Sequence, residues 1–189
     1  MLCNEGLGLV AYYYFDFSDT AKRDVRGLLS SLVVQLCAQS NLCYDILSGL
    51  YSKYNAGLRL PDDDTLIKCL KDMLKLAELP PIYIVVDALD ECPNSSGARK
   101  LVLDLIEDLV TSQLPTLRIC ITSRPEADIQ AALRPLVSQD VSLHEEDGQK
   151  QDIMDYISST VRSDKEMEQW ELEDRNLVID TLSRRADGM

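Results

Sequence analysis

Short apolar runs alternate along the chain with longer stretches in which apolar residues recur every third or fourth position. The short runs are rich in β-branched and aromatic residues, and they predict strands at 10–17, 82–86, 117–122 and, more weakly, 140–143. The longer stretches predict helices at 25–36, 44–54, 62–77, 101–110, 128–133, 152–161 and 177–186. This alternation is typical of an α/β domain in which helices flank a mostly parallel sheet.

Acidic residues stand at the predicted starts of two helices. Asp24 or Thr20 is expected to cap the helix that begins near Val25, because side-chain oxygens at this position accept hydrogen bonds from free backbone amides. The acidic triplet 62–64 opens a later helix. Three neighbouring carboxylates are also a candidate metal cluster, but acids in a first helical turn ordinarily complement the helix dipole. We therefore interpret the triplet as a helix start.

Composition indicates a soluble globular protein, since 46% of the 189 residues are hydrophobic and 27% are charged. No apolar run approaches the roughly 20 residues of a membrane span. Residues 1–8 lack the basic cluster of a secretory signal. The six cysteines are scattered without a C-x-x-C pair, which favours a reducing, cytoplasmic location.

The formal net charge of −13 argues against nucleic acid as a partner. A phosphate backbone is repelled by such a field unless a strong basic patch overrides it. The basic pairs at 22–23 and 184–185 are too small to do so. The tyrosines at 12–14 alternate between the two faces of their strand, so we expect core and surface positions rather than a platform for stacking bases.

The strongest chemical signal is the run 82–86, which is followed at once by Asp87 and then by Asp90 and Glu91. In open α/β sheets, ligands bind at the carboxyl ends of the strands. P-loop NTPases hold Mg²⁺ with a carboxylate at this position, and a second acid nearby can orient the attacking water. The alternative is that Asp87 caps the following segment while the other two acids are solvated.

A second signal follows the next predicted strand, where Arg124 ends the string Thr-Ser-Arg at 122–124. An arginine beside the acidic strand end suits the detection of a terminal phosphate, because its guanidinium grips oxygens in a fork. The alternative is a surface arginine paired with one of the many acids. The two signals together are more specific than either alone.

The two strand ends resemble a known family. The strings YIVVDALDEC at 83–92 and LRICITSRP at 117–125 are similar to those of the NACHT group of STAND P-loop NTPases. More narrowly, they resemble the nephrocystin-like NACHT proteins that are abundant in fungi. Further stretches agree with this resemblance, at 11–17, 28–36, 152–157 and 186–189.

The resemblance implies a P-loop NTPase fold of the ASCE/STAND type and a signalling switch within a larger, NLR-like protein. Such a switch couples the binding and slow hydrolysis of ATP or GTP, with Mg²⁺, to assembly with other NACHT protomers. Asp87 is then the Walker B ligand of Mg²⁺, Asp90 and Glu91 are the catalytic acids, and Arg124 senses the terminal phosphate.

One departure from the family is decisive for activity. The family's first strand leads into a G-x-x-x-x-G-K-[ST] loop, and none of the eight glycines here is followed by lysine. That loop supplies the backbone cradle, the lysine and the hydroxyl that bind phosphate and Mg²⁺. Its strand would lie between the strands at 117–122 and 140–143. We expect 1–189 to be part of a NACHT domain, truncated at both ends, that binds nucleotide weakly or not at all by itself.

Two functions from different classes remain open. In the first, the chain is part of a signalling NTPase, and the reading frame upstream of Met1 encodes the glycine-rich loop within about 50 codons. In the second, it is a degenerate NACHT remnant that acts as a protein-interaction module and binds no nucleotide. A hydrolase on another α/β scaffold is disfavoured because no G-x-S-x-G motif occurs. His144, the one histidine, is interpreted as a solvated loop residue, and the cysteine spacing excludes the usual zinc sites.

Overall fold

The computed structural model describes residues 8–54, 58–94, 97–142 and 147–186. The chain divides into two compact units, Met1–Val137 and Ser138–Met189, and each is described by itself. The assignment of 1–189 to a single domain stays a prediction.

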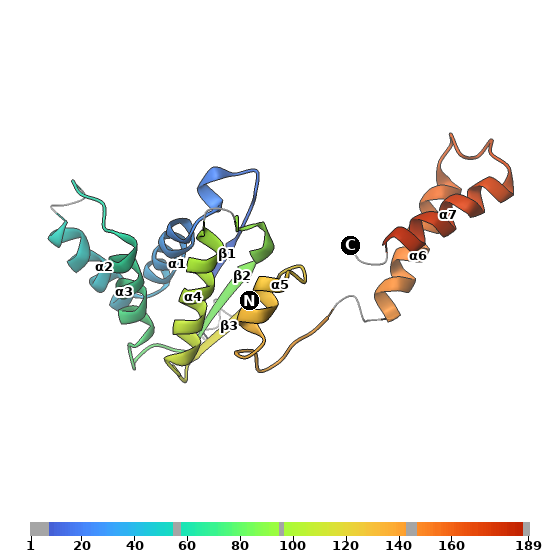
Figure 1. Ribbon diagram of the computed structural model, residues 1–189. Helices are drawn as coiled ribbons and strands as arrows, with labels where there is room; N and C mark the ends of the chain where they lie inside the picture. The colour runs from blue at the N-terminus through green and yellow to red at the C-terminus, as the bar shows by residue number, and fades with distance from the viewer. Residues whose placement is uncertain (1–7, 55–57, 95–96, 143–146, 187–189) are drawn as a thin grey trace. The chain divides into compact units, whose positions relative to one another are not determined.

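The sheet of the first unit has three parallel strands in the order β1-β2-β3 (Figure 1). These strands are β1 (Leu9–Tyr14), β2 (Ile82–Asp87) and β3 (Leu117–Ile121). Leu9 pairs with Ile82, which pairs in turn with Leu117, so the three strands start level with one another. Their carboxyl ends therefore meet at one rim of the sheet.

Among the described residues of this unit, five helices accompany the sheet in sequence order. They are α1 (Val25–Gln39), α2 (Asn41–Lys53), α3 (Asp63–Leu74), α4 (Ala98–Thr111) and α5 (Ala127–Leu133). Short 3-10 turns, η2 (Thr20–Lys22) and η3 (Leu89–Glu91), follow β1 and β2. The second unit is a hairpin of α6 (Asp147–Ser163) packed on α7 (Leu172–Ala186). The fold is α/β with an open parallel sheet flanked by helices, as the sequence predicted.

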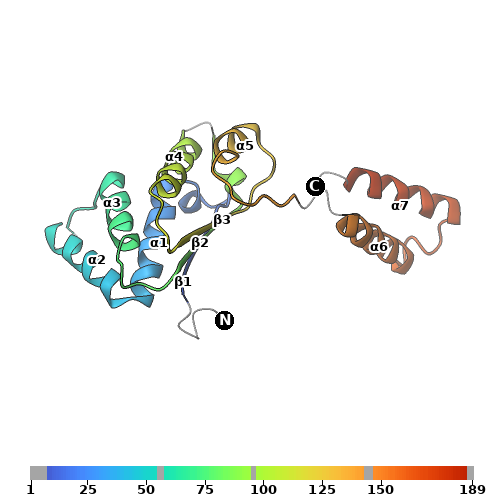
Figure 2. The ribbon, with the colours of Figure 1, turned by 90° about the horizontal axis from the view of Figure 1, so that it is seen from below.

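The core of the first unit lies on one face of the sheet. Alternate residues of β1 and β2 are buried there, because successive side chains of a strand point to opposite faces. α1 packs over β1 and contacts α3 and α4, so these helices cover the same face (Figure 2). The tyrosines divide as predicted, since Tyr13 is buried whereas Tyr12 and Tyr14 are exposed on the other face.

Helix starts follow the capping residues. The Asp24 carboxylate caps α1 by accepting a hydrogen bond from the Gly27 amide at 2.8 Å, which confirms one of the two predicted caps. Within the acidic triplet, Asp62 caps α3 by accepting from the Thr65 amide at 2.9 Å. The neighbouring Asp63 pairs with Arg26 at 2.8 Å. Two of the three acids thus serve the helix start and its connection to α1.

The predicted strand at 140–143 is wrong for its described residues. Residues 140–142 form no strand, and Val141 is exposed. A strand is stable only when its backbone groups pair with a neighbour, and a single apolar residue between Asp140 and Ser142 gives this segment little to bury. Leu143 and His144 lie outside the described residues. None of the helices in the described ranges combines the length and the apolar character of a membrane span.

Candidate functional site

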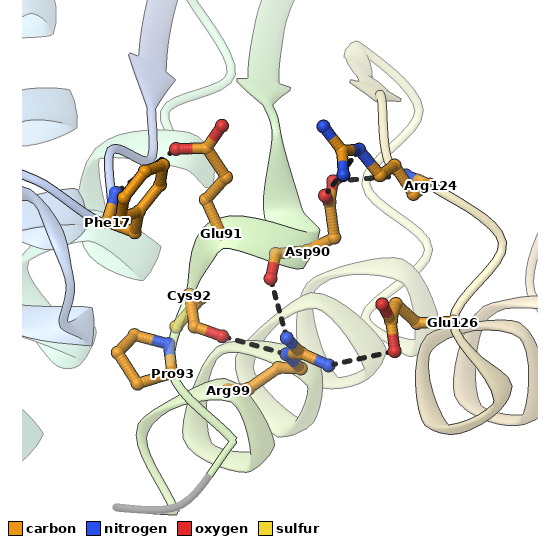
Figure 3. Close-up of a pocket in the computed structure, with 8 residues that line it drawn as sticks. All are labelled: Phe17, Asp90, Glu91, Cys92, Pro93, Arg99, Arg124 and Glu126. Carbon is orange, nitrogen blue, oxygen red and sulfur yellow. Dashed lines mark hydrogen bonds and ion pairs between the residues drawn. The ribbon is translucent and has the colours of Figure 1, made fainter. Parts of the chain in front are cut away.

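The rim at the carboxyl ends of the strands carries all four predicted site residues. Asp87 ends β2, Asp90 and Glu91 lie in η3 directly after it, and Arg124 follows β3. A pocket of about 390 Å³ opens beside η3. Its lining comes from the ends of β1 and β2, the start of α4 and the segment after β3 (Figure 3): Phe17, Asp90, Glu91, Cys92, Pro93, Arg99, Arg124 and Glu126.

Asp87 is exposed at the rim and does not line this pocket. Its carboxylate accepts a hydrogen bond from the hydroxyl of Thr122, the residue that follows β3. The same Thr122 oxygen accepts a hydrogen bond from the Ala88 amide at 3.0 Å. The threonine therefore joins the end of β2 to the end of β3 at the point where the first carboxylate stands.

Ala88 turns the chain from β2 into η3 with a left-handed backbone, at φ 53° and ψ 47°. This conformation is unfavourable in free energy for any residue with a Cβ, so surrounding contacts must stabilise it. Besides the Ala88 amide, the Leu89 amide is bonded to Thr122, donating to its carbonyl at 3.0 Å. This turn brings Asp90 and Glu91 to the pocket.

Asp90 and Arg124 form the contact that joins the two predicted signals. The Arg124 amide donates to Asp90 Oδ1 at 3.0 Å, and the Arg124 Nε lies 3.5 Å from Asp90 Oδ2 (Figure 3). The Asp90 side chain is 11% exposed and that of Arg124 is 82% exposed. The acid is therefore nearly buried against the backbone, while most of the guanidinium side chain remains available to solvent.

Glu91 extends from η3 toward the segment that follows β1. Its Oε2 accepts a hydrogen bond from the Phe17 amide at 3.1 Å. Phe17 is exposed and lines the same pocket. One predicted catalytic acid is thus bonded to the segment after β3, and the other to the segment after β1.

Arg99, a buried residue in the first turn of α4, is not among the site residues predicted from the sequence. Its guanidinium donates to the carbonyl oxygens of Asp90 at 2.6 Å and Cys92 at 2.9 Å. It also donates to both carboxylate oxygens of Asp128 at 3.2 Å. In Figure 3 the same guanidinium lies between Asp90, Cys92 and Glu126, and its Nη1 is 4.0 Å from Glu126 Oε2. A signal was available, because helical spacing puts Arg99 on the apolar face of α4 with Val102.

The thiol in the pocket lining is not a nucleophile. Burial raises the pKa of Cys92 to about 11, since a thiolate is poorly solvated in an apolar surrounding. Its Sγ lies 3.4 Å from the Arg23 carbonyl oxygen, to which the thiol donates. At neutral pH this cysteine therefore behaves as a small packing residue.

A divalent cation at this rim would find few protein ligands. Among the described residues, no group of three or more His, Cys, Asp or Glu side chains can hold a metal ion. Mg²⁺ is ordinarily bound by one or two carboxylates, with waters and phosphate oxygens at its other positions. The Asp87 carboxylate is exposed at the rim, and a cation bound there would depend on water and other external oxygens for its remaining positions.

Comparison with known proteins gives one family. Residues 2–124 match the family model described as Nephrocystin 3, N-terminal, which is more than half of the 189-residue chain. A search of the curated proteins finds no match. The matched segment runs from before β1 to Arg124 and includes Asp87, Asp90 and Glu91.

Proposed function

Since the chain belongs to the nephrocystin 3 N-terminal family, we propose that it forms part of a NACHT-type nucleoside-triphosphatase switch. In this proposal the rim with Asp87, Asp90, Glu91 and Arg124 faces the triphosphate of ATP or GTP. What supports it is the direct contact of Asp90 with Arg124, since acidic and basic groups from two neighbouring strand ends meet beside a pocket.

The exposure of each rim residue indicates its role in this proposal. Asp87 points to solvent at the rim and would supply the carboxylate ligand of Mg²⁺, which neutralises phosphate charge when bound. Arg124 is mostly exposed and reaches from the rim toward a terminal phosphate. Glu91 lines the pocket beside the nearly buried Asp90 and is the better placed of the two to orient a water molecule.

Phosphate binding in the complete domain would need more than these residues. No glycine-rich loop of this kind occurs in the 189 residues, so these residues alone do not supply the backbone cradle or the phosphate-binding lysine. By itself, the chain is expected to bind nucleotide weakly. Assembly with other protomers of the family belongs to the same proposal.

One set of contacts favours the second candidate, a degenerate remnant that acts as an interaction module. Asp90 and Glu91 are both engaged by backbone amides, those of Arg124 and Phe17. In this second function the acids only fix the segments around η3. The two candidates differ in whether the rim contributes to nucleotide affinity.

A titration with a fluorescent ATP analogue and Mg²⁺ separates them. The chain is compared with a longer form that carries its natural upstream sequence, each with Asp87→Asn or with Asp45→Asn as a charge-matched control on exposed α2. We expect micromolar binding by the longer form, weakened about tenfold or more by Asp87→Asn only. Equal affinities for the two variants, or no binding by a longer form that contains the glycine-rich loop, would exclude the switch.

A further inference from the structure

The outer edge of β1 is bonded to side chains rather than to another strand. In a parallel pair, alternate residues of a strand bond to the neighbour and the residues between them face away. The Leu9 amide donates to the Pro81 carbonyl at 2.9 Å and the Phe15 amide to the Asp87 carbonyl at 3.0 Å, so the odd-numbered residues bond toward β2. The backbone groups of Val10 and Tyr12 therefore face the free edge.

Two glutamines of α1 bond to these edge groups. Gln39 accepts from the Val10 amide at 3.1 Å through Oε1 and donates to the Val10 carbonyl at 2.8 Å through Nε2. Gln35 makes the same pair of hydrogen bonds with Tyr12. Its Oε1 accepts from the Tyr12 amide at 3.0 Å, and its Nε2 donates to the Tyr12 carbonyl at 2.7 Å. Each side-chain amide thus makes the donor and acceptor pair that a residue of an adjacent strand would make.

The spacing of the two glutamines matches that of the strand. Four residues of an α-helix rise about 6 Å, and two residues of a β-strand rise about 6.6 Å. Glutamines four apart on α1 can therefore meet edge groups two apart on β1, with the helix and the strand running in opposite directions. Gln35 is also held by Ser31, whose Oγ accepts from its Nε2 at 2.8 Å, so a bond within α1 helps to fix the direction of this side-chain amide.

The two edges of the sheet differ in this respect. At β3, the Ile82 amide donates to the Thr116 carbonyl and the Thr122 amide to the Val86 carbonyl, so the even-numbered residues bond toward β2 and the backbone groups of Ile119 face away. Among the hydrogen bonds of the described residues, none joins a side chain to Ile119 as the glutamines are joined to β1. An open strand edge is a template for another strand, whereas a paired edge is not.

We propose that Gln35 and Gln39 close the β1 edge against strand addition and so keep a second copy of this chain from extending the sheet there. The two amides satisfy the backbone groups that an incoming strand would need. Self-association by strand pairing is thereby directed away from β1. This inference is independent of nucleotide binding.

The test replaces both glutamines by leucine, which keeps the side-chain volume and removes the amides. In the Gln35→Leu/Gln39→Leu variant of the 189-residue chain, hydrogen exchange of the Val10 and Tyr12 amides is expected to rise about tenfold or more, because each loses its acceptor. The Ala11 amide, which faces β2, should be unaffected. Sedimentation equilibrium should show more dimer than the unmodified chain, with protection at Val10 and Tyr12 returning as the protein concentration rises.

Two further variants separate edge pairing from added hydrophobicity. Gln130→Leu, on the exposed side of α5, should change neither exchange at β1 nor self-association. Gln35→Glu/Gln39→Glu keeps an oxygen acceptor for each edge amide but loses the amide donors and lines the edge with charge, so exchange at Val10 and Tyr12 should stay slow and no dimer should form. If the leucine pair does not fold, Gln39→Leu alone gives the same measurement at Val10. In the leucine variants, unchanged exchange at Val10 and Tyr12, or faster exchange without added self-association, would overturn the proposal.

Discussion

Each acidic residue of the rim holds a different neighbouring segment in addition to its proposed chemistry. Asp87 is bonded to Thr122, Asp90 to Arg124, and Glu91 to the Phe17 amide. A substitution of Asp90 or Glu91 therefore changes backbone positions as well as charge. The described side-chain hydrogen bond of Asp87 is with one hydroxyl, that of Thr122. Of the three acids, Asp87 is therefore the one whose substitution best isolates the effect of the negative charge.

The left-handed backbone of Ala88 gives a prediction at the scale of one residue. Ala88→Gly should raise the free energy of unfolding by about 0.5–1 kcal/mol, because glycine adopts positive φ without steric cost. Ala88→Val should lower it by about 1–2 kcal/mol, since a β-branched residue fits this conformation poorly. Urea denaturation followed by circular dichroism measures both. A glycine variant that loses as much stability as the valine variant would show that the turn is not strained.

The gathering of the four rim residues could be predicted from sequence for a simple reason. Parallel strands end at the same edge, so residues that follow 82–86 and 117–122 must lie near one another. The contacts of Arg99 with Asp90 and Asp128 could not be predicted, because they depend on how α4 and α5 pack after the chain has folded.

At the scale of elements, Arg99 connects η3, α4 and α5. It is buried and bonded to two carbonyls of the η3 segment and to the Asp128 carboxylate. Arg99→Met should lower the free energy of unfolding by about 2–4 kcal/mol, since it leaves these partners unpaired. Arg99→Lys should recover little, because an ammonium cannot reproduce the forked geometry.

Urea denaturation measures the loss, with the exposed Lys100→Met as the neighbouring control. That control is expected to stay within about 0.5 kcal/mol of the unmodified chain. An Arg99→Met variant as stable as Lys100→Met would contradict the assigned role of the buried guanidinium.

The start of α3 gives a prediction about pH. Hydrogen bonds from the Thr65 hydroxyl and amide hold the pKa of Asp62 below its ordinary value of 3.8. The cap therefore stabilises the fold above that value, and its contribution is lost as the pH falls through the lowered pKa. Asp62→Asn keeps an oxygen acceptor but does not titrate, so the stability of this variant should fall less steeply below about pH 4.

Urea denaturation midpoints at neutral pH and at about pH 3 measure how steeply the stability of each variant falls with pH. Asp45→Asn on α2 removes the same charge away from the cap and serves as the comparison. If Asp62→Asn and Asp45→Asn show the same slope, the cap does not contribute to the acid sensitivity.

Elements with long, regular periodicity were predicted well, whereas isolated segments were not. α1 follows from the spacing of Leu28, Leu32 and Leu36, all of which are buried. α2 begins earlier than predicted because Ser40 caps it, accepting from the Cys43 amide at 3.4 Å. The strand prediction for 140–142 was wrong because a strand forms only when its backbone pairs with another strand, and the local sequence does not show whether such a partner is present.

In the whole molecule, the described helices of the first unit cover only one face of its parallel sheet. Tyr12, Tyr14 and Cys120 are exposed on the other face, although parallel sheets are ordinarily covered on both. Alternation of strands and helices predicted the layers of this unit. It did not predict the division of the chain near Val137, because the strand expected at 140–143 continued the alternation past that position.

The most direct test of the central claim maps where a metal-bound nucleotide contacts this chain. Mn²⁺ with ATP is added to the isotope-labelled protein, and the paramagnetic broadening of each backbone amide is measured by NMR, a method that detects weak binding. Broadening is expected to begin at Ala88, Glu91 and Arg124 and to be reduced by Asp87→Asn. Broadening centred on the acidic triplet 62–64, or spread evenly over the acidic surface, would contradict the claim.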